Sequence, residues 1–208
     1  MKNFAYRFIK RLLDFIIAIF GIILLIPVSL GVWIANMING DFGPLIFKNK
    51  RIGLNGKTIY VYKYRSMCKN AEQVLEDLMN KDPKIKEEYL TNKKLENDPR
   101  ITKVGKFIRK TSIDELPQFI NVLKGNMSIV GPRPYLHREI DDMGEAYNEI
   151  IKCKPGITGL WQVSGRNDTS FTERTLLDVK YKNKRSLWVD IKIFFKTIKV
   201  VLVGKGAK

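Results

Sequence analysis

The chain of 208 residues has little cysteine and histidine, and this scarcity argues against two common kinds of site. Its two cysteines, Cys68 and Cys153, lie far apart and form no Cys-x-x-Cys pair, so neither a disulfide framework nor a thiol redox motif is indicated. Because His137 is the only histidine, a zinc site would need carboxylate ligands as well. We therefore expect reduced thiols in a protein that faces the cytosol.

The chain is also short of acidic residues relative to basic ones. Lys and Arg number 37 against 21 Asp and Glu, which gives a formal net charge of +16. Such a bias indicates a polyanionic partner: phosphorylated substrates, an anionic membrane surface or nucleic acid. No RNP-like motif or clear recognition helix is present, so no nucleic acid is expected. The sequence also contains neither a GxGxxG motif nor a Walker loop, and hence no nucleotide fingerprint.

A long apolar run occupies residues 15–35. Its only polar side chain is Ser29, and about 20 apolar residues suffice to cross the hydrocarbon core of a bilayer. Pro27 lies within the run, where proline removes a backbone hydrogen bond and kinks a helix. Basic residues precede it (Lys2, Arg7, Lys10, Arg11) and follow it (Lys48, Lys50, Arg51). Because basic flanks favour the cytoplasm, a re-entrant helix that bends at Pro27 and leaves on the side it entered satisfies both flanks. A plain transmembrane anchor remains the alternative.

The rest of the chain predicts an α+β fold, mostly helical with a small β-hairpin or sheet. Asn55-Gly56 between two β-prone runs is a strong hairpin signal, and the second strand carries Lys63 and Arg65 on one face. Residues 70–98 read as a solvated helical excursion with a break at Pro83. The last helix, over residues 187–203, places three lysines on one face and apolar residues on the rest. This pattern is typical of an amphipathic helix in a membrane interface, or of a helix that packs on the core.

Two adjacent acids, Asp114 and Glu115, stand out in this basic chain. Cations gather before the pair (Lys103, Lys106, Arg109, Lys110) and after it (Lys124, Arg133). Ser112-x-x-Glu115 has the form of a capping box, and a helix start there would explain both acids without any chemistry. A carboxylate pair among cations and glycine turns also suits the handling of phosphate through a metal or a nucleophilic carboxylate. The segment alone leaves both interpretations open.

Two further loops carry arginines on stiff or glycine-rich backbone. Arg133 lies between the two prolines of Gly-Pro-Arg-Pro, which would hold it in a fixed direction. The stretch KPGITGLWQVSGRND carries Trp161 and Arg166 among glycines that permit close backbone approach to a ligand. Rigid turns with exposed arginines would look the same.

Three long segments resemble, in order and spacing, the catalytic domain of the bacterial monotopic phosphoglycosyl transferases, which act on polyprenyl phosphates. They are TSIDELPQFINVLKGNMSIVGPRP, KPGITGLWQVSGRND and LWVDIKIFFKTIKVVL. The resemblance covers nearly the whole chain and is strongest to the undecaprenyl-phosphate galactose phosphotransferases. The transmembrane helices and soluble module that precede the catalytic part of those larger enzymes have no counterpart here. The chain therefore resembles a minimal version or an excised catalytic domain.

This resemblance implies a two-step transfer from a UDP-sugar to undecaprenyl phosphate. Asp114 would attack the sugar-bearing phosphorus and release UMP, with Glu115 beside it, and the aspartyl phosphosugar would then pass to the carrier. The resemblance implies Mg²⁺ at Asp114, with Asp178 as a further metal-shell acid. It also implies phosphate-binding roles for Lys63, Arg65, Arg109 and Arg133, and we add Arg166 from its glycine-rich loop. Galactose is the expected sugar, and glucose or an N-acetylated sugar is the alternative.

The resemblance further implies a place in the cell and an organisation of the chain. Residues 1–40 would form the re-entrant membrane helix, and residues 41–208 one catalytic domain on the cytoplasmic face of the bacterial inner membrane, in contact with lipid. In the family the helix breaks at a Ser-Pro pair, whereas here Ile26 precedes Pro27 and Ser29 follows two residues later. The expected role is the first membrane step of surface polysaccharide assembly, and a homodimer is possible. The competing hypotheses are a basic membrane-bound binding module and a structural anchor.

Overall fold

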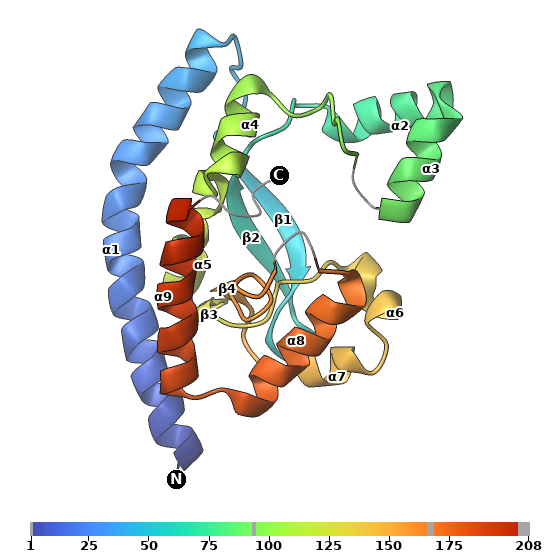
Figure 1. Ribbon diagram of the computed structural model, residues 1–208. Helices are drawn as coiled ribbons and strands as arrows, with labels where there is room; N and C mark the ends of the chain where they lie inside the picture. The colour runs from blue at the N-terminus through green and yellow to red at the C-terminus, as the bar shows by residue number, and fades with distance from the viewer. Residues whose placement is uncertain (1, 93–94, 166–168, 204–208) are drawn as a thin grey trace.

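A long N-terminal helix lies along one side of a small, mostly helical domain (Figure 1). The computed structural model describes residues 2–92, 95–165 and 169–203. The longer helices are α1 (Lys2–Ile38), α2 (Ala71–Lys81), α3 (Pro83–Asn92), α4 (Lys103–Lys110), α5 (Gln118–Leu123), α8 (Phe171–Lys184) and α9 (Leu187–Val203). Shorter helical segments are η1 (Leu54–Gly56), η2 (Ile113–Glu115), η3 (His137–Glu139), α6 (Ile140–Met143) and α7 (Ala146–Ile150). Four strands, β1 (Ile46–Ile52), β2 (Thr58–Tyr64), β3 (Ser128–Val130) and β4 (Gly156–Thr158), form two separate two-stranded sheets. The expected α+β class is therefore confirmed.

The expected hairpin is β1–β2, an antiparallel pair that runs from Ile46 opposite Tyr64 to Ile52 opposite Thr58. Asn55 and Gly56 both adopt positive φ, as their positions in the turn require. The fully buried Asn121 of α5 attaches the hairpin to the rest of the domain. Its amide accepts from the Tyr62 N–H at 3.0 Å and donates to the Tyr60 carbonyl at 2.6 Å, so that it satisfies the edge of β2 as a neighbouring strand would.

The second sheet brings the two glycine-rich loops together. Strands β3 and β4 are parallel, and Gly131 donates to the Thr158 carbonyl at 2.9 Å. A Cβ added at Gly156 would lie 2.1 Å from the Gly131 nitrogen, so a side chain there would force the loops apart. The Gly-Pro-Arg-Pro loop thus lies directly against the loop that carries Trp161.

Helix α1 is continuous through Pro27 and bowed rather than broken (Figure 1). One stripe, which includes Asp14, Ala18, Leu25, Val32 and Asn36, is buried against the domain, while large apolar side chains cover the remaining surface. The helix is long and apolar enough to cross a membrane, and its exposed apolar face supports membrane association. The expected break of the helix at Pro27 is therefore wrong for this structure. The re-entrant path through the membrane stays a prediction.

The region around Pro27 is held by strand β2 of the domain. Ser29 Oγ lies 2.6 Å from the hydroxyl of Tyr64, and that hydroxyl donates to the Leu25 carbonyl at 3.4 Å. Tyr64 ends strand β2 and is fully buried. Proline removes one N–H from the helix, and the nearby polar atoms find partners in a neighbouring element.

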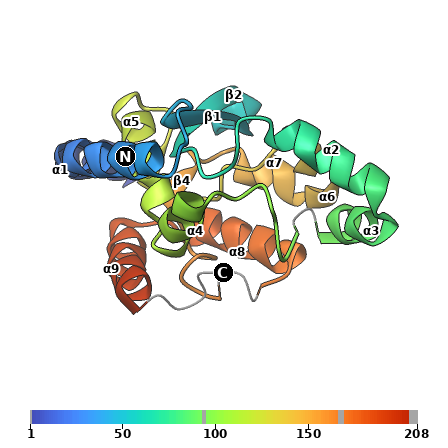
Figure 2. The ribbon, with the colours of Figure 1, turned by 90° about the horizontal axis from the view of Figure 1, so that it is seen from above.

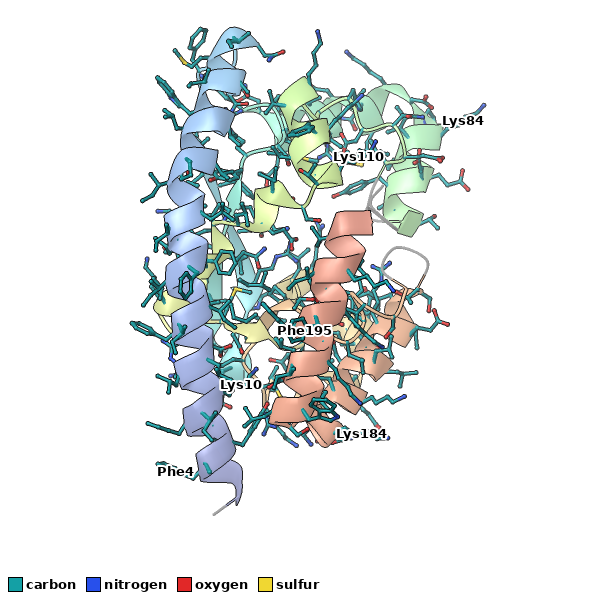
Figure 3. The ribbon with its side chains drawn as sticks, turned by 60° about the vertical axis from the view of Figure 1, so that its left-hand side comes forward. Phe4, Lys10, Lys84, Lys110, Lys184 and Phe195 are labelled. Carbon is teal, nitrogen blue, oxygen red and sulfur yellow. The ribbon has the colours of Figure 1, made fainter. Side chains whose placement is uncertain are left out.

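Helix α9 has the bounds that the sequence predicted and runs beside α1 in the same direction (Figure 1). Lys10 and Tyr6 of α1 both bond to Asp190 of α9 at 2.9 Å, and Figure 3 shows Lys10 between the two helices. Trp188, Phe195 and further apolar residues of α9 are exposed. Helices α2 and α3 lie at the opposite edge of the domain from α1, with the expected break before Pro83 (Figure 2).

Candidate functional site

Asp114 and Glu115 lie on a sharp turn between two helices. Helix α4 ends at Lys110, and Ser112 then adopts a left-handed conformation with φ of 59° before the short helical turn η2. The predicted capping box is wrong, because in this conformation the Ser112 side chain accepts no capping hydrogen bond and Glu115 Oε1 turns to Lys63 instead. Left-handed backbone at a residue other than glycine costs free energy, and such strain concentrates at functional sites. The turn presents both carboxylates to one side of the domain.

Lys63 of β2 binds the acid pair. Its Nζ lies 2.7 Å from Glu115 Oε1 and 3.7 Å from Asp114 Oδ2. Asp114 is only 9% exposed, and this burial raises the pKa of its carboxyl to about 6, although Lys63 opposes the shift. Asp114 is therefore largely ionised at neutral pH and yet poorly hydrated. A carboxylate in that state is a better nucleophile than one in bulk water.

Both acids line a broad cleft of about 2420 Å³ between the hairpin, α4 and the α2–α3 pair. Its lining is rich in cations, namely Lys50, Arg51, Lys63, Arg65, Lys69, Arg100, Lys106, Arg109, Lys110, Arg133 and Arg138. In Figure 3, Lys110 extends from α4 toward the α2–α3 side of the molecule. A cleft lined mainly by one sign of charge attracts anions of the other sign.

The structure gives two of the predicted phosphate ligands different surroundings. Arg109 lines the cleft, and its Nε donates to Ser66 Oγ at 2.8 Å. Burial lowers the pKa of Arg109, and among nearby charges Asp114 opposes this shift most. Arg65 is already occupied: both terminal nitrogens bond to Asp41 at 2.8 Å, and Nε donates to the Pro44 carbonyl at 2.8 Å. Arg65 thus attaches β2 to the segment that follows α1, and this bidentate pair indicates a structural role.

Arg133 is aimed into the cleft by its own loop. Its guanidinium lies 5.6 Å from the ring of Trp161 and 5.8 Å from that of Tyr135, and its Nη2 is 3.7 Å from Glu139 Oε1. The stacking rings hold the planar group in one direction. Arg166 lies outside the described residues.

Asp178, the predicted metal-shell acid, lies behind the Gly-Pro-Arg-Pro loop rather than in the cleft lining. It is fully buried, and its Oδ2 accepts from the Arg133 N–H at 3.0 Å and from the Tyr135 hydroxyl at 2.9 Å. Burial raises the pKa of this carboxyl to about 7 despite these two hydrogen bonds. The geometry assigns Asp178 to holding the loop of Arg133.

The acid pair could hold a divalent cation only together with a ligand. In the described parts of the chain, no three His, Cys, Asp or Glu side chains are grouped closely enough to bind a metal by themselves. Mg²⁺, however, commonly takes one or two carboxylates and completes its shell with water and substrate phosphates. Asp114 and Glu115 fit that arrangement.

Arg51 is one of the cleft residues that the sequence reasoning missed. It was counted only as a basic flank of the apolar run, but it faces the cleft from β1, with its Nη1 3.2 Å from the Pro134 carbonyl. Arg51 shares the face of Lys63 because it lies opposite Ile59, a register that the Asn55-Gly56 motif alone does not predict.

Comparison with known proteins places these features in context. A family model described as "Bacterial sugar transferase" matches residues 5–204. The chain is 47% identical over 201 residues to the undecaprenyl-phosphate galactose phosphotransferase of Salmonella typhimurium, covering 97% of this chain and 42% of that protein. It is 42% identical to the exopolysaccharide production protein ExoY of Sinorhizobium fredii, over 95% of this chain and 87% of that protein. It is 40% identical to the UDP-glucose:undecaprenyl-phosphate glucose-1-phosphate transferase of Escherichia coli, over 97% of this chain and 42% of that protein. The chain thus spans less than half the length of the Salmonella and Escherichia relatives.

Proposed function

We propose that this chain, which belongs to the bacterial sugar transferase family, moves a hexose 1-phosphate from a UDP-sugar to undecaprenyl phosphate, a first membrane step of surface polysaccharide assembly. The observation that carries the proposal is a buried, ionised aspartate on a strained turn at the edge of a cationic cleft. The names of the relatives support the substrate class, and those of higher identity favour galactose. UDP-glucose is the second candidate, because a relative at 40% identity is named for it.

In the first step, an oxygen of Asp114 attacks the sugar-bearing phosphorus of the UDP-sugar. The new carboxyl–phosphorus bond forms as the bond from that phosphorus to the bridging oxygen breaks, and the electron pair leaves on UMP. In the second step, an oxygen of the carrier phosphate attacks the same phosphorus, and the Asp114 carboxylate is released unchanged. Two successive displacements let one site serve a soluble donor and then a lipid acceptor.

The side chains around Asp114 make the first step feasible. Lys63 holds Glu115 and stands close to Asp114, which fixes the direction of the pair. Arg109 and the other cations of the cleft reduce the repulsion between an anionic nucleophile and a diphosphate. Mg²⁺ held by Asp114 and Glu115 together with the substrate would neutralise phosphate charge.

We further propose that α1 dips into the cytoplasmic membrane and returns, with the cleft facing the cytoplasm. Pro27 in the middle of the apolar run and the apolar faces of α1 and α9 support this orientation. Tags at the two ends of the chain should both report from the cytoplasm. Opposite locations would show that α1 spans the bilayer.

The test is to follow UMP release and a covalent adduct in the purified protein. The chain is incubated with Mg²⁺, undecaprenyl phosphate and a panel of UDP-sugars labelled in the sugar. We expect UMP release and labelled protein with UDP-galactose, and neither from Asp114→Asn. Asp142→Asn, which removes an exposed acid, is the matched control. Normal UMP release from Asp114→Asn would sink the mechanism.

A further inference from the structure

Three arginines gather at the part of the cleft next to the Gly-Pro-Arg-Pro loop. Arg51 comes from β1, Arg133 from the loop itself and Arg138 from η3, and all three line the cleft. Arg51 is tied to the loop, since its Nη1 donates to the Pro134 carbonyl at 3.2 Å. Pro134 follows Arg133 in the chain, so the Arg51 guanidinium lies beside the backbone of the loop that carries Arg133. Burial and then the charge of Arg133 are the largest causes that lower the pKa of Arg51.

The acids near these arginines are already engaged. The charged groups that act on Arg51 are Arg133, Arg138, Glu139 and Glu115. Glu139 lies 3.7 Å from Arg133 through one oxygen and accepts from the Leu136 N–H at 2.6 Å through the other. Glu115 is bound by Lys63 at 2.7 Å. The cluster of arginines therefore carries excess positive charge toward the cleft.

Other arginines of the same cleft show how the chain neutralises a guanidinium that serves structure alone. Arg65 is paired with Asp41 and Arg100 with Asp98, each through two short hydrogen bonds. Within the described parts of the chain, Arg51 makes no such ion pair. Burial and Arg133 together lower the pKa of Arg51 to about 10, so its positive charge lies in an unfavourable environment, which an anion would improve.

We propose that Arg51 and Arg133 form a second phosphate subsite, separate from the one at Asp114, which holds the phosphate that leaves on the uridine nucleotide. This inference rests on the proposed function, because a UDP-sugar brings two linked phosphates into the cleft at once. Lys63 and Arg109 lie near Asp114 and would bind the sugar-bearing phosphate that is attacked. Arg51 and Arg133 would bind the uridine-bearing phosphate.

The subsite would act on the bond that breaks. As the bridging oxygen separates from the sugar-bearing phosphorus, negative charge grows on the departing monophosphate. N–H groups of Arg51 and Arg133 donate to its oxygens, and no proton has to be transferred. Arg133 is held against Trp161 and Tyr135, and Arg51 against the Pro134 carbonyl, so these donors are oriented before the substrate arrives.

The experiment measures UMP binding by calorimetry, without sugar or carrier. Arg51→Gln should weaken UMP binding at least tenfold relative to the unsubstituted chain. Lys48→Gln is the control, because Lys48 lies on the same strand, carries the same charge and is exposed outside the cleft lining. We expect less than a twofold change for it. Equal UMP binding in Arg51→Gln and the unsubstituted chain, or equal losses in Arg51→Gln and Lys48→Gln, would overturn the subsite.

A milder substitution covers the case in which Arg51→Gln does not fold. Arg51→Lys keeps the charge and loses the planar fork, and we expect at least a threefold loss of UMP affinity; an unchanged affinity contradicts the proposal. Binding of UMP without turnover is independent of the chemistry at Asp114. A chain that binds UMP through Arg51 but transfers no sugar would refute the proposed reaction alone. A chain that turns over normally after Arg51→Gln and binds UMP as before would refute the subsite alone.

Discussion

Asp114 and Asp178 are both buried aspartates with a raised pKa, and both were predicted to belong to the site, yet the structure gives them opposite tasks. Asp114 lines the cleft, 3.7 Å from Lys63, on a strained turn. Asp178 faces inward and accepts hydrogen bonds from the Arg133 backbone and the Tyr135 hydroxyl. Its second oxygen, Oδ1, is buried and has no hydrogen-bond partner among the residues that the structure describes.

The comparison teaches that a perturbed carboxyl is not by itself a sign of chemistry. Burial is the largest cause of the raised pKa at both positions. The two positions differ in whether a ligand can reach the carboxylate oxygens and whether cationic side chains lie beside them. In this structure Asp178 holds the loop that aims Arg133. Substitutions at the two positions should therefore separate activity from stability.

The largest expected difference is in activity. Asp114→Asn should lower UMP release by roughly 10³-fold or more, since it removes the nucleophile. The rate of UMP release by Asp178→Asn should stay within about threefold of the unsubstituted chain, because the amide oxygen can still accept both hydrogen bonds and burial already raises the pKa of the carboxyl to about 7. Initial rates of UMP release measure both variants. A loss in Asp178→Asn as deep as that in Asp114→Asn would break the distinction.

Stability should show the reverse order. Asp178→Ala leaves the Arg133 N–H and the Tyr135 hydroxyl without an acceptor, and each such donor costs about 1–3 kcal/mol. We expect the free energy of unfolding to fall by about 2–4 kcal/mol, whereas Asp114→Asn should not lower it. Urea denaturation in detergent, followed by circular dichroism, gives both values. Equal stability of the two variants would contradict the structural role of Asp178.

The pH dependence separates the two carboxyls again. With a pKa near 6, Asp114 must lose its proton to attack, so kcat/KM should fall about tenfold per pH unit below pH 5, in Asp178→Asn as in the unsubstituted chain. Folding raises both pKa values above the usual value of 3.8 for Asp. The contribution of each carboxyl to stability is therefore largest below about pH 4 and is lost as pH rises through about 6 for Asp114 and about 7 for Asp178. Each Asn variant should lose its share of this decline in the free energy of unfolding between about pH 4 and pH 8, as measured by urea titration.

Local patterns predicted much of the fold. The Asn-Gly hairpin, the break before Pro83 and the last helix, over residues 187–203, follow from turn chemistry and hydrophobic periodicity within a short window. Asp114 and Glu115 were found through the long motifs around them. What failed was the detail of their own turn, because the positive φ of Ser112 is not encoded in the Ser-x-x-Glu pattern.

Local patterns could not show partners that are distant in sequence. The role of Arg65 depends on Asp41, and that of Asp178 on Arg133, 45 residues away. Arg51 depends on register: a two-residue turn at Asn55-Gly56 would place it opposite Tyr60, on the wrong face. The observed loop has three residues, Leu54–Gly56, closed by the Gly53 N–H to the Lys57 carbonyl at 2.7 Å. This shift of one position moves Arg51 to the face of Lys63.

The smallest expected effect comes from a substitution at Tyr64. This residue is a limiting case of the contrast between Asp114 and Asp178, because it adjoins cleft residues in the chain but its hydroxyl does not face the acid pair. Tyr64 adjoins Lys63 and Arg65 on β2, but its hydroxyl points away from the acid pair to Ser29 and Leu25 of α1. If only groups that face the ligand serve chemistry, Tyr64→Phe should cost about 1 kcal/mol of stability and leave UMP release within about threefold. Tyr60→Phe is the control, since Tyr60 is exposed on the same strand.

Measuring the two half-reactions separately makes the Tyr64 test sharper. UMP release reports on the soluble donor, whereas, in the proposed membrane orientation, transfer from the protein to undecaprenyl phosphate also depends on how α1 positions the cleft relative to the membrane. An equal, small change in both steps would mean that Tyr64 contributes stability alone. A loss of more than tenfold in transfer, with UMP release intact, would mean that a buried group outside the ligand's reach governs the lipid step. The contrast between Asp114 and Asp178 would then hold for bond-making at phosphorus but not for access of the lipid carrier.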